Sequence, residues 1–214
     1  MSAAPQVFWP RLLNATPLGP RLKLLRFSSW PKFEFSAGQF LMLSFPDAGE
    51  TWRAYSLCSS PADAASFFEI AVAEGGGFSK RLFALTPQAQ DQIRARGPYG
   101  GWTWRGEGHA ILVGAGSAIA PFRSMTLLGK GRITLFISAD SSQDFYFSQE
   151  YGSWKATRVH QRQGAWRPAE IAAADSDRTA TYFLCGGAAA VQELAAGLRG
   201  QGVRAEKIRS ESWG

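Results

Sequence analysis

The sequence predicts two folded parts in succession, a small antiparallel β domain followed by an α/β domain with a parallel sheet. In the first half, short apolar and aromatic segments stand between Pro, Gly, Ser and Asp residues, as they do in antiparallel barrels and sandwiches. In the second half, apolar strand candidates alternate with helical stretches, a pattern that predicts a parallel sheet with crossover helices. A chain of 214 residues has room for both domains.

Strand candidates follow one another in the first half, and one helix is expected among them. The helix is "SKRLFAL", residues 79–85, with Ser79 in a position suited to N-capping. This spacing leaves a barrel and a sandwich both open. The strand candidates are "RLKLLRF" (21–27), "QFLMLSF" (39–45), "WRAYSL" (52–57), "FFEIAVA" (67–73) and "DQIRAR" (91–96).

The second half has a different rhythm, in which helices follow strands. The helical stretches are "PFRSMTLLGK" (121–130) and "AAAVQELAAGLRGQG" (188–202), and the strand candidates are "HAILVGAG" (109–116), "RITLFISA" (132–139) and "ATYFLCGG" (180–187). Between the halves, glycines, a proline and two tryptophans in "GPYGGWTWRGEG", residues 97–108, interrupt both patterns. The predicted domains are therefore 1–106 and 107–214.

Composition limits the chemistry and the partners of this chain. Its cysteines are Cys58 and Cys185, and its histidines are His109 and His160. These are too few for a disulfide framework or an iron-sulfur cluster, and their spacing predicts no metal site. Redox chemistry would therefore need a bound organic cofactor.

Charge and hydropathy narrow the partners and the location. The net charge of +6 is spread along the chain, which argues against nucleic acid and leaves an acidic protein, an anionic substrate or ordinary solubilising surface charge. No apolar run reaches the roughly 18 residues of a membrane span, and the N-terminus lacks the order of a signal peptide. We therefore expect a cytoplasmic protein with no membrane span.

The stretch "GAGSAIAPFRSM", residues 114–125, predicts a phosphate-binding turn. The preceding strand is expected to end at Val113, the turn to cover 114–120, and Pro121 to stand in the first helical turn. A glycine turn at the carboxyl end of a parallel strand lets the backbone approach a pyrophosphate, towards which the next helix directs its N–H groups. The alternative is that the small residues only allow the helix and the strand to pack.

Two further side chains are expected at the same edge of the sheet. Asp140 follows the second strand, where a carboxylate can accept hydrogen bonds from an adenosine ribose and repel a 2′-phosphate. Cys185, beside Gly186, ends the third strand, where its thiol could contact a nicotinamide. The alternatives are a solvated loop aspartate and a cysteine that fills the core as a small apolar residue.

The first half carries a second pair of candidate binding motifs. In "RAYSLCSSP", residues 53–61, strand alternation places Arg53 and Tyr55 on one face and Ser56 on the other, which would serve an anionic group, a flat ring and a polar ring atom. The alternative is an ordinary strand with an exposed arginine. In "EGGGFSKRLF", residues 74–83, glycines, Ser79 and a helix start suit another phosphate. Two such turns in two domains suggest two nucleotides.

With these motifs in order, the chain resembles the ferredoxin-NADP reductase superfamily, whose members pair an antiparallel Greek-key, FAD-binding β-barrel with a nicotinamide-binding α/β domain. The resemblance extends over nearly the whole chain, in the two-domain form without an iron-sulfur domain. It is carried by "FSAGQFLML", "RAYSL" followed by "SSP", "GGGFSKRL", "GPYGGW", "GAGSAIAPFRS", "FLCGG" and the terminal "SESWG".

The resemblance implies roles for residues of these motifs. Arg53 matches the arginine that holds the FAD pyrophosphate, Tyr55 the ring that packs on the isoalloxazine, and Ser56 the hydroxyl near flavin N5. Ser56, Cys185 and Glu211 are the expected catalytic residues, and no metal is expected. The expected cofactor contacts are Arg53, Tyr55, Ser56, Val72, Gly76, Gly77, Phe78, Ser79, Gly114, Gly116, Ser117, Ala118, Pro121, Asp140, Cys185, Gly186 and Trp213.

Three departures from the family pattern bear on nucleotide binding. Ala118 replaces the usual glycine and adds a methyl group where backbone and ligand come close, which we expect to weaken or shift nicotinamide binding. Gly187 replaces the usual proline in "CGGAAAV". Asp140 stands where NADPH-selective relatives tend to carry arginine, which favours NADH over NADPH.

The predicted function is that of an FAD-dependent reductase, in which hydride passes from NADH to flavin N5. The electrons would then pass to a separate ferredoxin or oxygenase component, and "WTWRGEG", residues 102–108, is expected to be exposed and to fit such a partner. One alternative is a flavin or quinone reductase with a diffusible acceptor. The other is a non-catalytic FAD-binding subunit without productive nicotinamide binding, for which Ala118 and "CGGAAAV" would be the support.

Overall fold

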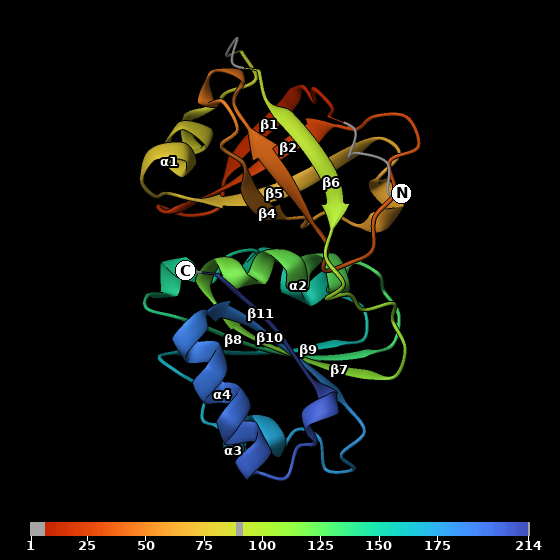
Figure 1. The fold of residues 1–214 in the computed structure, drawn as a ribbon. Helices are drawn as coiled ribbons and strands as arrows, with labels where there is room; N and C mark the ends of the chain where they lie inside the picture. The colour runs from red at the N-terminus through yellow and green to blue at the C-terminus, as the bar shows by residue number, and fades with distance from the viewer. Residues whose placement is uncertain (1–6, 89–91, 214) are drawn as a thin grey trace.

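The first half of the chain folds into two antiparallel three-stranded sheets around one core. A computed structural model describes residues 7–88 and 92–213. One sheet has the order β1-β2-β5, with β1 Leu12–Pro17, β2 Leu22–Ser28 and β5 Phe67–Ala73. The other has the order β4-β3-β6, with β3 Phe40–Ser44, β4 Arg53–Ser56 and β6 Arg94–Tyr99. Helix α1, Gly77–Ala84, follows β5 at one side of this barrel (Figure 1).

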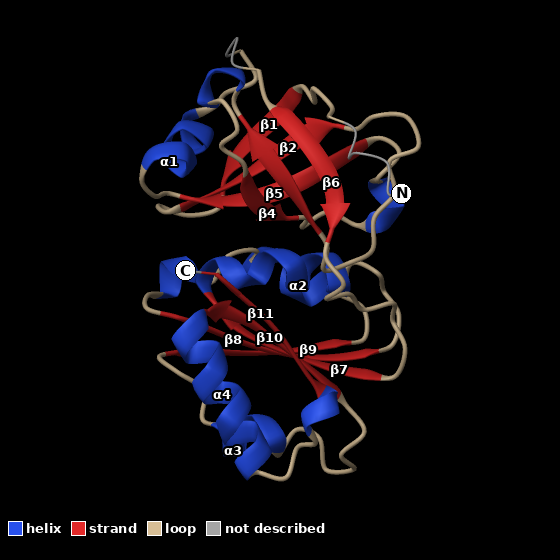
Figure 2. Ribbon diagram, in the orientation of Figure 1, coloured by secondary structure: helices blue, strands red, loops and turns tan. Residues whose placement is uncertain are grey.

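The second half is a parallel sheet with helices on both faces (Figure 2). Its order is β11-β10-β7-β8-β9, and every neighbouring pair is parallel. Helix α2, Ile119–Thr126, covers the face towards the barrel, whereas α3, Pro168–Ala172, and α4, Ala188–Gly200, cover the other. The strands are β7 His109–Ala115, β8 Arg132–Ala139, β9 Thr157–Gln163, β10 Thr181–Gly187 and β11 Ile208–Trp213.

Short 3-10 helices occupy several of the connections. They are Pro46–Ala48, Pro61–Asp63, Gly116–Ala118, Ser142–Asp144, Ser148–Ser153 and Ala205–Lys207. In the described part of the chain, no helix has the length and hydropathy that crossing a membrane would require.

The predicted fold class is confirmed, but three strands were missed. Strands β1, β9 and β11 consist of half-buried and exposed residues with none fully buried, and each lies at the edge of its sheet. By contrast, β7, β8 and β10 are buried along most of their length, which gives them apolar runs that a sequence reveals. The predicted strand 91–96 begins at Arg94, and its first residue lies outside the described residues.

Two predicted helix boundaries were also wrong. Helix α1 begins at Gly77 with Gly76 as its N-cap, so Ser79 lies inside the first turn and does not cap it. Strand β7 continues to Ala115 and α2 begins at Ile119. The turn between them is therefore shorter than predicted, although Pro121 does lie in the first turn of α2.

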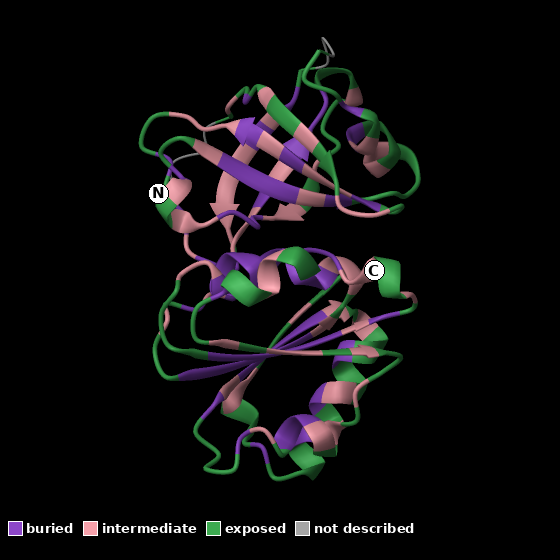
Figure 3. Cartoon of the chain, turned by 180° about the vertical axis from the view of Figure 1, so that it is seen from behind, coloured by how far each residue is buried: buried purple, intermediate pink, exposed green. Residues whose placement is uncertain are grey.

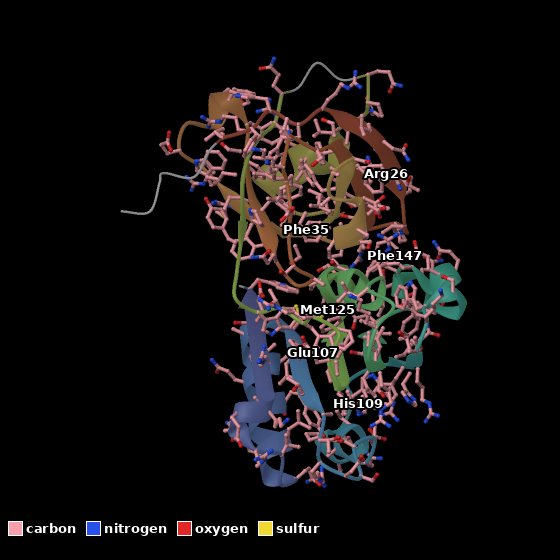
Figure 4. The ribbon with its side chains drawn as sticks, turned by 90° about the vertical axis from the view of Figure 1, so that its right-hand side faces the viewer. Arg26, Phe35, Glu107, His109, Met125 and Phe147 are labelled. Carbon is pink, nitrogen blue, oxygen red and sulfur yellow. The ribbon has the colours of Figure 1, made fainter. Side chains whose placement is uncertain are left out.

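The junction between the halves is a shared apolar core. Trp102 and Trp104 are 9% and 5% exposed and pack in one cluster with Leu22 of β2 and Met125 of α2. The expectation of an exposed "WTWRGEG" was therefore wrong for its two tryptophans. A side chain on Gly38 would lie 2.2 Å from the Trp102 carbonyl oxygen and 2.9 Å from Met125 Cε, so this glycine permits the close approach. Figures 3 and 4 show the buried α2 and Met125 at this junction.

Candidate functional site

The first candidate site lies where β4 meets the start of α1. The Tyr55 hydroxyl and Ser79 Oγ share a hydrogen bond of 3.1 Å, which joins the two predicted flavin motifs. Arg53 is exposed, and its Nη1 donates a hydrogen bond of 3.1 Å to the carbonyl oxygen of its neighbour Trp52. The guanidinium thus remains available to an anion beside Tyr55.

Aromatic rings line the floor of this site. The rings of Tyr55 and Phe78 have centroids 6.3 Å apart and an interplanar angle of 28°, and Phe45 packs on Phe78 at 4.9 Å. Tyr55 is half-buried, and this burial raises the pKa of its phenol above the ordinary value. The phenol therefore acts as a neutral hydrogen-bonding group attached to a flat apolar surface.

The glycines at the start of α1 leave the backbone open. A side chain on Gly76 or Gly77 would meet nothing within 4 Å, and Gly77 has a φ of +51°. A left-handed glycine at the start of a helix exposes N–H groups to an anion. The side chains and backbone present thus match the requirements of a dinucleotide phosphate.

Two other predicted residues of the first half lie differently. Ser56 is half-buried and opposite Phe40 in the β3–β4 register, on the other face of the strand from Tyr55. Val72, by contrast, is 0% exposed and belongs to the barrel core. Its side chain therefore presents no surface to a ligand, and its place among the expected cofactor contacts stays a prediction.

The second candidate site is a pocket at the carboxyl ends of the parallel strands. Its volume is about 210 Å³, and it lies between β7, β10, α4 and the connection from β9 to α3. Gly114, Cys185 and Gly186 lie at this edge as predicted. The lining residues are Val113, Gly114, Ala115, Ser138, Ala165, Trp166, Pro168, Cys185, Gly186, Gly187, Ala190, Val191, Glu193 and Leu194.

Sequence reasoning missed Trp166 in this pocket. Its indole packs edge-on against Phe136 at 5.0 Å, and the Arg162 guanidinium lies 4.3 Å from its ring centroid. The indole N–H is buried and donates no hydrogen bond within the described residues. Trp166 is a single tryptophan after a polar edge strand, so it belongs to no periodic apolar pattern in the sequence. Its position between two motifs was the one sequence signal that could have suggested a role.

In the turn between β7 and α2, some residues pack in the core and others have free space around them. Ala118 is 0% exposed, and its Cβ would lie 2.7 Å from a side chain on Gly114. The methyl group therefore points beneath the turn, and the effect of Ala118 on nicotinamide binding stays a prediction. Pro121 is also buried. Gly116, with a φ of +52° and nothing within 4 Å of an added side chain, and the half-buried Ser117 form the open part.

Cys185 and Glu211 stand side by side on β10 and β11. Cys185 is 3% exposed, and burial raises the pKa of its thiol well above the ordinary value. Burial also raises the pKa of the Glu211 carboxyl. The pair therefore favours a neutral thiol and a carboxyl group that holds its proton to higher pH than usual.

The remaining predicted residues lie at the margins of the two sites. Asp140 is exposed and directly follows β8, at the edge where β7 and β10 also end. Trp213 is 43% exposed at the end of β11 and pairs in register with Gly187. Ala71 of β5 packs against the apolar cluster that contains Ala118, so the turn before α2 approaches the strand that leads to Gly76.

Comparison with known proteins agrees with this arrangement. Residues 12–104 match the family of oxidoreductase FAD-binding domains. Ferredoxin-NADP reductase B of Sorangium cellulosum is 39% identical over 126 residues, which are 55% of this chain and 50% of that protein. The reductase component of propane 2-monooxygenase from Mycolicibacterium goodii is 33% identical over 129 residues, 56% of this chain and 36% of that protein. The chain thus spans half the length of these curated relatives or less.

The fold itself is found in solved structures. A cytochrome P450 reductase from Amycolatopsis superposes with a TM-score of 0.84 over 97% of this chain and 70% of that one, at 19% identity. The likeness covers both the barrel and the parallel sheet.

Proposed function

Because residues 12–104 match oxidoreductase FAD-binding domains and the chain is similar to a ferredoxin-NADP reductase, we propose that it is an FAD-dependent reductase that takes hydride from NADH. The observation that carries the proposal is the position of the two candidate sites on either side of one junction. The Tyr55–Ser79 pair lies in the barrel, the pocket beside Cys185 lies in the parallel sheet, and β5 packs against the turn that precedes α2.

The barrel residues fit a flavin dinucleotide. Arg53 would pair with the pyrophosphate, the open backbone at Gly76 and Gly77 would donate N–H groups to it, and the Tyr55 ring would pack on the isoalloxazine. When bound, FAD supplies the ability to accept a hydride and to release electrons one at a time.

The residues of this chain would position the reactants and hold protons. Ser56 Oγ would hydrogen-bond at flavin N5, and the protonated carboxyl of Glu211 would hold a proton beside Cys185. Cys185 and Gly186 would shape the pocket for the nicotinamide, while Gly116 and Ser117 would bind its pyrophosphate. Hydride transfer then depends chiefly on how these groups are oriented.

Asp140 supports NADH as the electron donor. Its carboxylate is exposed at the end of β8, where it would accept hydrogen bonds from a ribose and repel a 2′-phosphate. The pocket, together with the Ala118 methyl group that points beneath the turn, supports a catalytic reductase over a non-catalytic subunit.

The electron acceptor would be a separate ferredoxin or oxygenase component. One curated relative is named as a ferredoxin-NADP reductase and another as a reductase component of a monooxygenase. The net charge of +6 suits an acidic partner, although the buried tryptophans 102 and 104 cannot form its docking surface. Transfer rates that do not change from low to high salt would contradict a charge-steered partner.

An anaerobic absorbance titration tests the proposal. The purified, FAD-loaded protein should lose its flavin band on addition of NADH, and it should need a far higher concentration of NADPH. A flavin band that neither nucleotide bleaches would support the non-catalytic alternative instead. Rapid turnover of free flavin or quinone, with no gain from added ferredoxin, would favour the diffusible acceptor.

A further inference from the structure

One buried guanidinium belongs to both halves of the molecule. Arg123 of α2 has an 11% exposed side chain. It donates to Glu150 twice, from Nε at 2.8 Å and from Nη2 at 3.0 Å. Its Nη1 donates to Glu69 Oε2 at 2.8 Å and to the Cys58 carbonyl oxygen at 2.9 Å, both in the barrel.

The partners of Arg123 are themselves held in place. Glu69 of β5 has a 3% exposed side chain and also accepts a 2.8 Å hydrogen bond from Arg26 Nε. On the other side, the Arg123 guanidinium lies 4.7 Å from the ring centroid of Phe147. Figure 4 shows Arg26 in the barrel above Phe147 at the junction. Arg26 and Glu69 both lie in the barrel, so it is the bonds of Arg123 to Glu69 and Cys58 that connect the two halves.

This network connects the segments that carry both candidate sites. Cys58 follows Ser56 by two residues, and its N–H donates to the Glu69 carbonyl oxygen at 2.9 Å. Arg123 follows the open turn at Gly116 and Ser117 within α2. Glu150 lies in the connection that begins after β8, at Asp140. The Arg123 guanidinium thus connects α2, the helix that follows the predicted nucleotide-binding turn, to the segment that follows the predicted flavin-binding motif.

Cohesion alone does not require these charges. A buried ion pair is expensive to desolvate, and apolar residues of similar volume often hold a structure as well. The junction already has an apolar core of Trp102, Met125 and Leu22. A planar guanidinium with four hydrogen bonds to three partners adds geometric definition, which a point-like ammonium cannot reproduce.

We propose that Arg123 is a positioning residue that fixes the angle between barrel and parallel sheet, and thereby the approach of the nicotinamide pocket to the flavin site. The first part of this proposal, that Arg123 fixes the angle, is independent of the proposed function. The second part, the approach of the nicotinamide pocket to the flavin site, rests on that function. Displacement of reacting groups by about 1 Å can cost on the order of 100-fold in rate, so a small change in this angle should be visible in hydride transfer.

The first experiment measures the angle without using activity. Nitroxide labels at Ala65→Cys in the barrel and Ala196→Cys in α4, both exposed positions, report the distance between the halves, because Cys58 and Cys185 are buried. The Arg123→Lys and Glu150→Gln variants should broaden or shift the distance distribution. Arg26→Gln is the matched control, since Arg26 pairs with the same Glu69 from the barrel side. An unchanged distribution in folded Arg123→Lys protein would overturn the proposal.

The second experiment measures the consequence for the proposed reaction. In rapid mixing with NADH, Arg123→Lys should lower the limiting rate of flavin bleaching at least tenfold, with FAD content and half-saturating NADH changed less than about twofold. An equal loss in Arg26→Gln, or an unchanged limiting rate in Arg123→Lys, would contradict the positioning role. If the unsubstituted protein is not bleached at all, the proposed function fails, while the label distances still decide whether Arg123 fixes the angle.

Discussion

The methyl group of Ala118 occupies the space that a side chain on Gly114 would need, with 2.7 Å between the two Cβ positions. A side chain on Gly114 would also lie 2.8 Å from the Cys185 carbonyl oxygen and 2.9 Å from Phe122 Cε2. Gly114 and Ala118 therefore form a complementary pair that packs the start of α2 onto β7 and β10.

This pair predicts a loss of stability for each of two simple substitutions. Gly114→Ala should destabilise the fold by about 1–3 kcal/mol, because backbone and ring must move to admit a methyl group. Ala118→Gly should cost about 1 kcal/mol and leave the half-saturating NADH concentration unchanged. Urea unfolding and NADH titration check both. Tighter NADH binding by Ala118→Gly would show that the methyl group does reach the nucleotide.

The Tyr55–Ser79 hydrogen bond predicts a separation of stability from FAD binding. Tyr55→Phe removes the 3.1 Å bond to Ser79, which should cost about 1 kcal/mol of unfolding free energy while the ring still packs on FAD. Tyr55→Ala should weaken FAD binding about tenfold or more, since stacking on an aromatic ring contributes about 1–3 kcal/mol. Fluorescence titration of the apoprotein with FAD measures both. Tyr151→Phe, which removes a hydroxyl bond to Tyr146 in the other half, is the control.

Asp140 predicts the nucleotide preference. Asp140→Asn should lower the selectivity for NADH over NADPH at least tenfold, because the carboxylate that would repel the 2′-phosphate is gone. The ratio of the two half-saturating concentrations for flavin bleaching measures this. Asp144→Asn removes a carboxylate from the same connection, where it accepts a 2.8 Å bond from Tyr146, and should leave the ratio unchanged. An equal ratio in both variants would argue that selectivity lies elsewhere in the site.

His109 predicts a loss of stability in mild acid. Arg132 Nη2 lies 3.0 Å from Nδ1, and Thr134 Oγ1 lies 3.0 Å from Nε2. Since an arginine can only donate, Nδ1 must accept and Nε2 must carry the proton. Burial lowers the pKa of His109 below 6.5, and the Arg132 charge lowers it further, against the opposing charges of Asp175 and Asp177.

The sign of this effect follows from linkage. The unfolded histidine takes up a proton at higher pH than the folded one, so the contribution of His109 to stability is complete above pH 6.5 and declines as the pH falls below it. His160, with a pKa that burial and Arg158 lower, adds in the same direction. Urea unfolding between pH 7.5 and 5 should show a shallower pH dependence for His109→Gln than for the unsubstituted protein. An unchanged slope would exclude His109 as a contributor.

The local sequence pattern was sufficient to predict those strands that are buried on both faces. Strands β7, β8 and β10 are buried on both faces, so their apolar runs and the edge at which they end could be predicted. Strand β9, "TRVHQRQ", is an edge strand with alternating exposure, and its sequence is compatible with a loop. Burial by partners distant in sequence was the missing information.

The same limit applied to the site. Arg123 belongs to the motif "GAGSAIAPFRSM", yet its role depends on Glu69, 54 residues earlier, and on Glu150, 27 residues later. The orientation of Ala118 likewise depends on Gly114 and Phe122 as packed neighbours. Spacing predicted which segments meet at the edge of the sheet, whereas the direction of each side chain required the tertiary structure.

We expect substitution of Glu211 to raise the stability of the fold at high pH and to lower the rate of flavin bleaching by NADH. Burial raises the pKa of its carboxyl, so the folded protein binds the proton more tightly than the unfolded chain, and stability falls as the pH rises above the ordinary value of 4.5. Glu211→Gln removes this loss and should raise the unfolding midpoint at pH 8 but not at pH 4. If the carboxyl holds the proton that the reaction uses beside Cys185, the same variant should slow flavin bleaching by NADH at least tenfold. A variant that is more stable at pH 8 and equally fast would restrict Glu211 to a structural role and leave Ser56 as the hydrogen-bonding group at flavin N5.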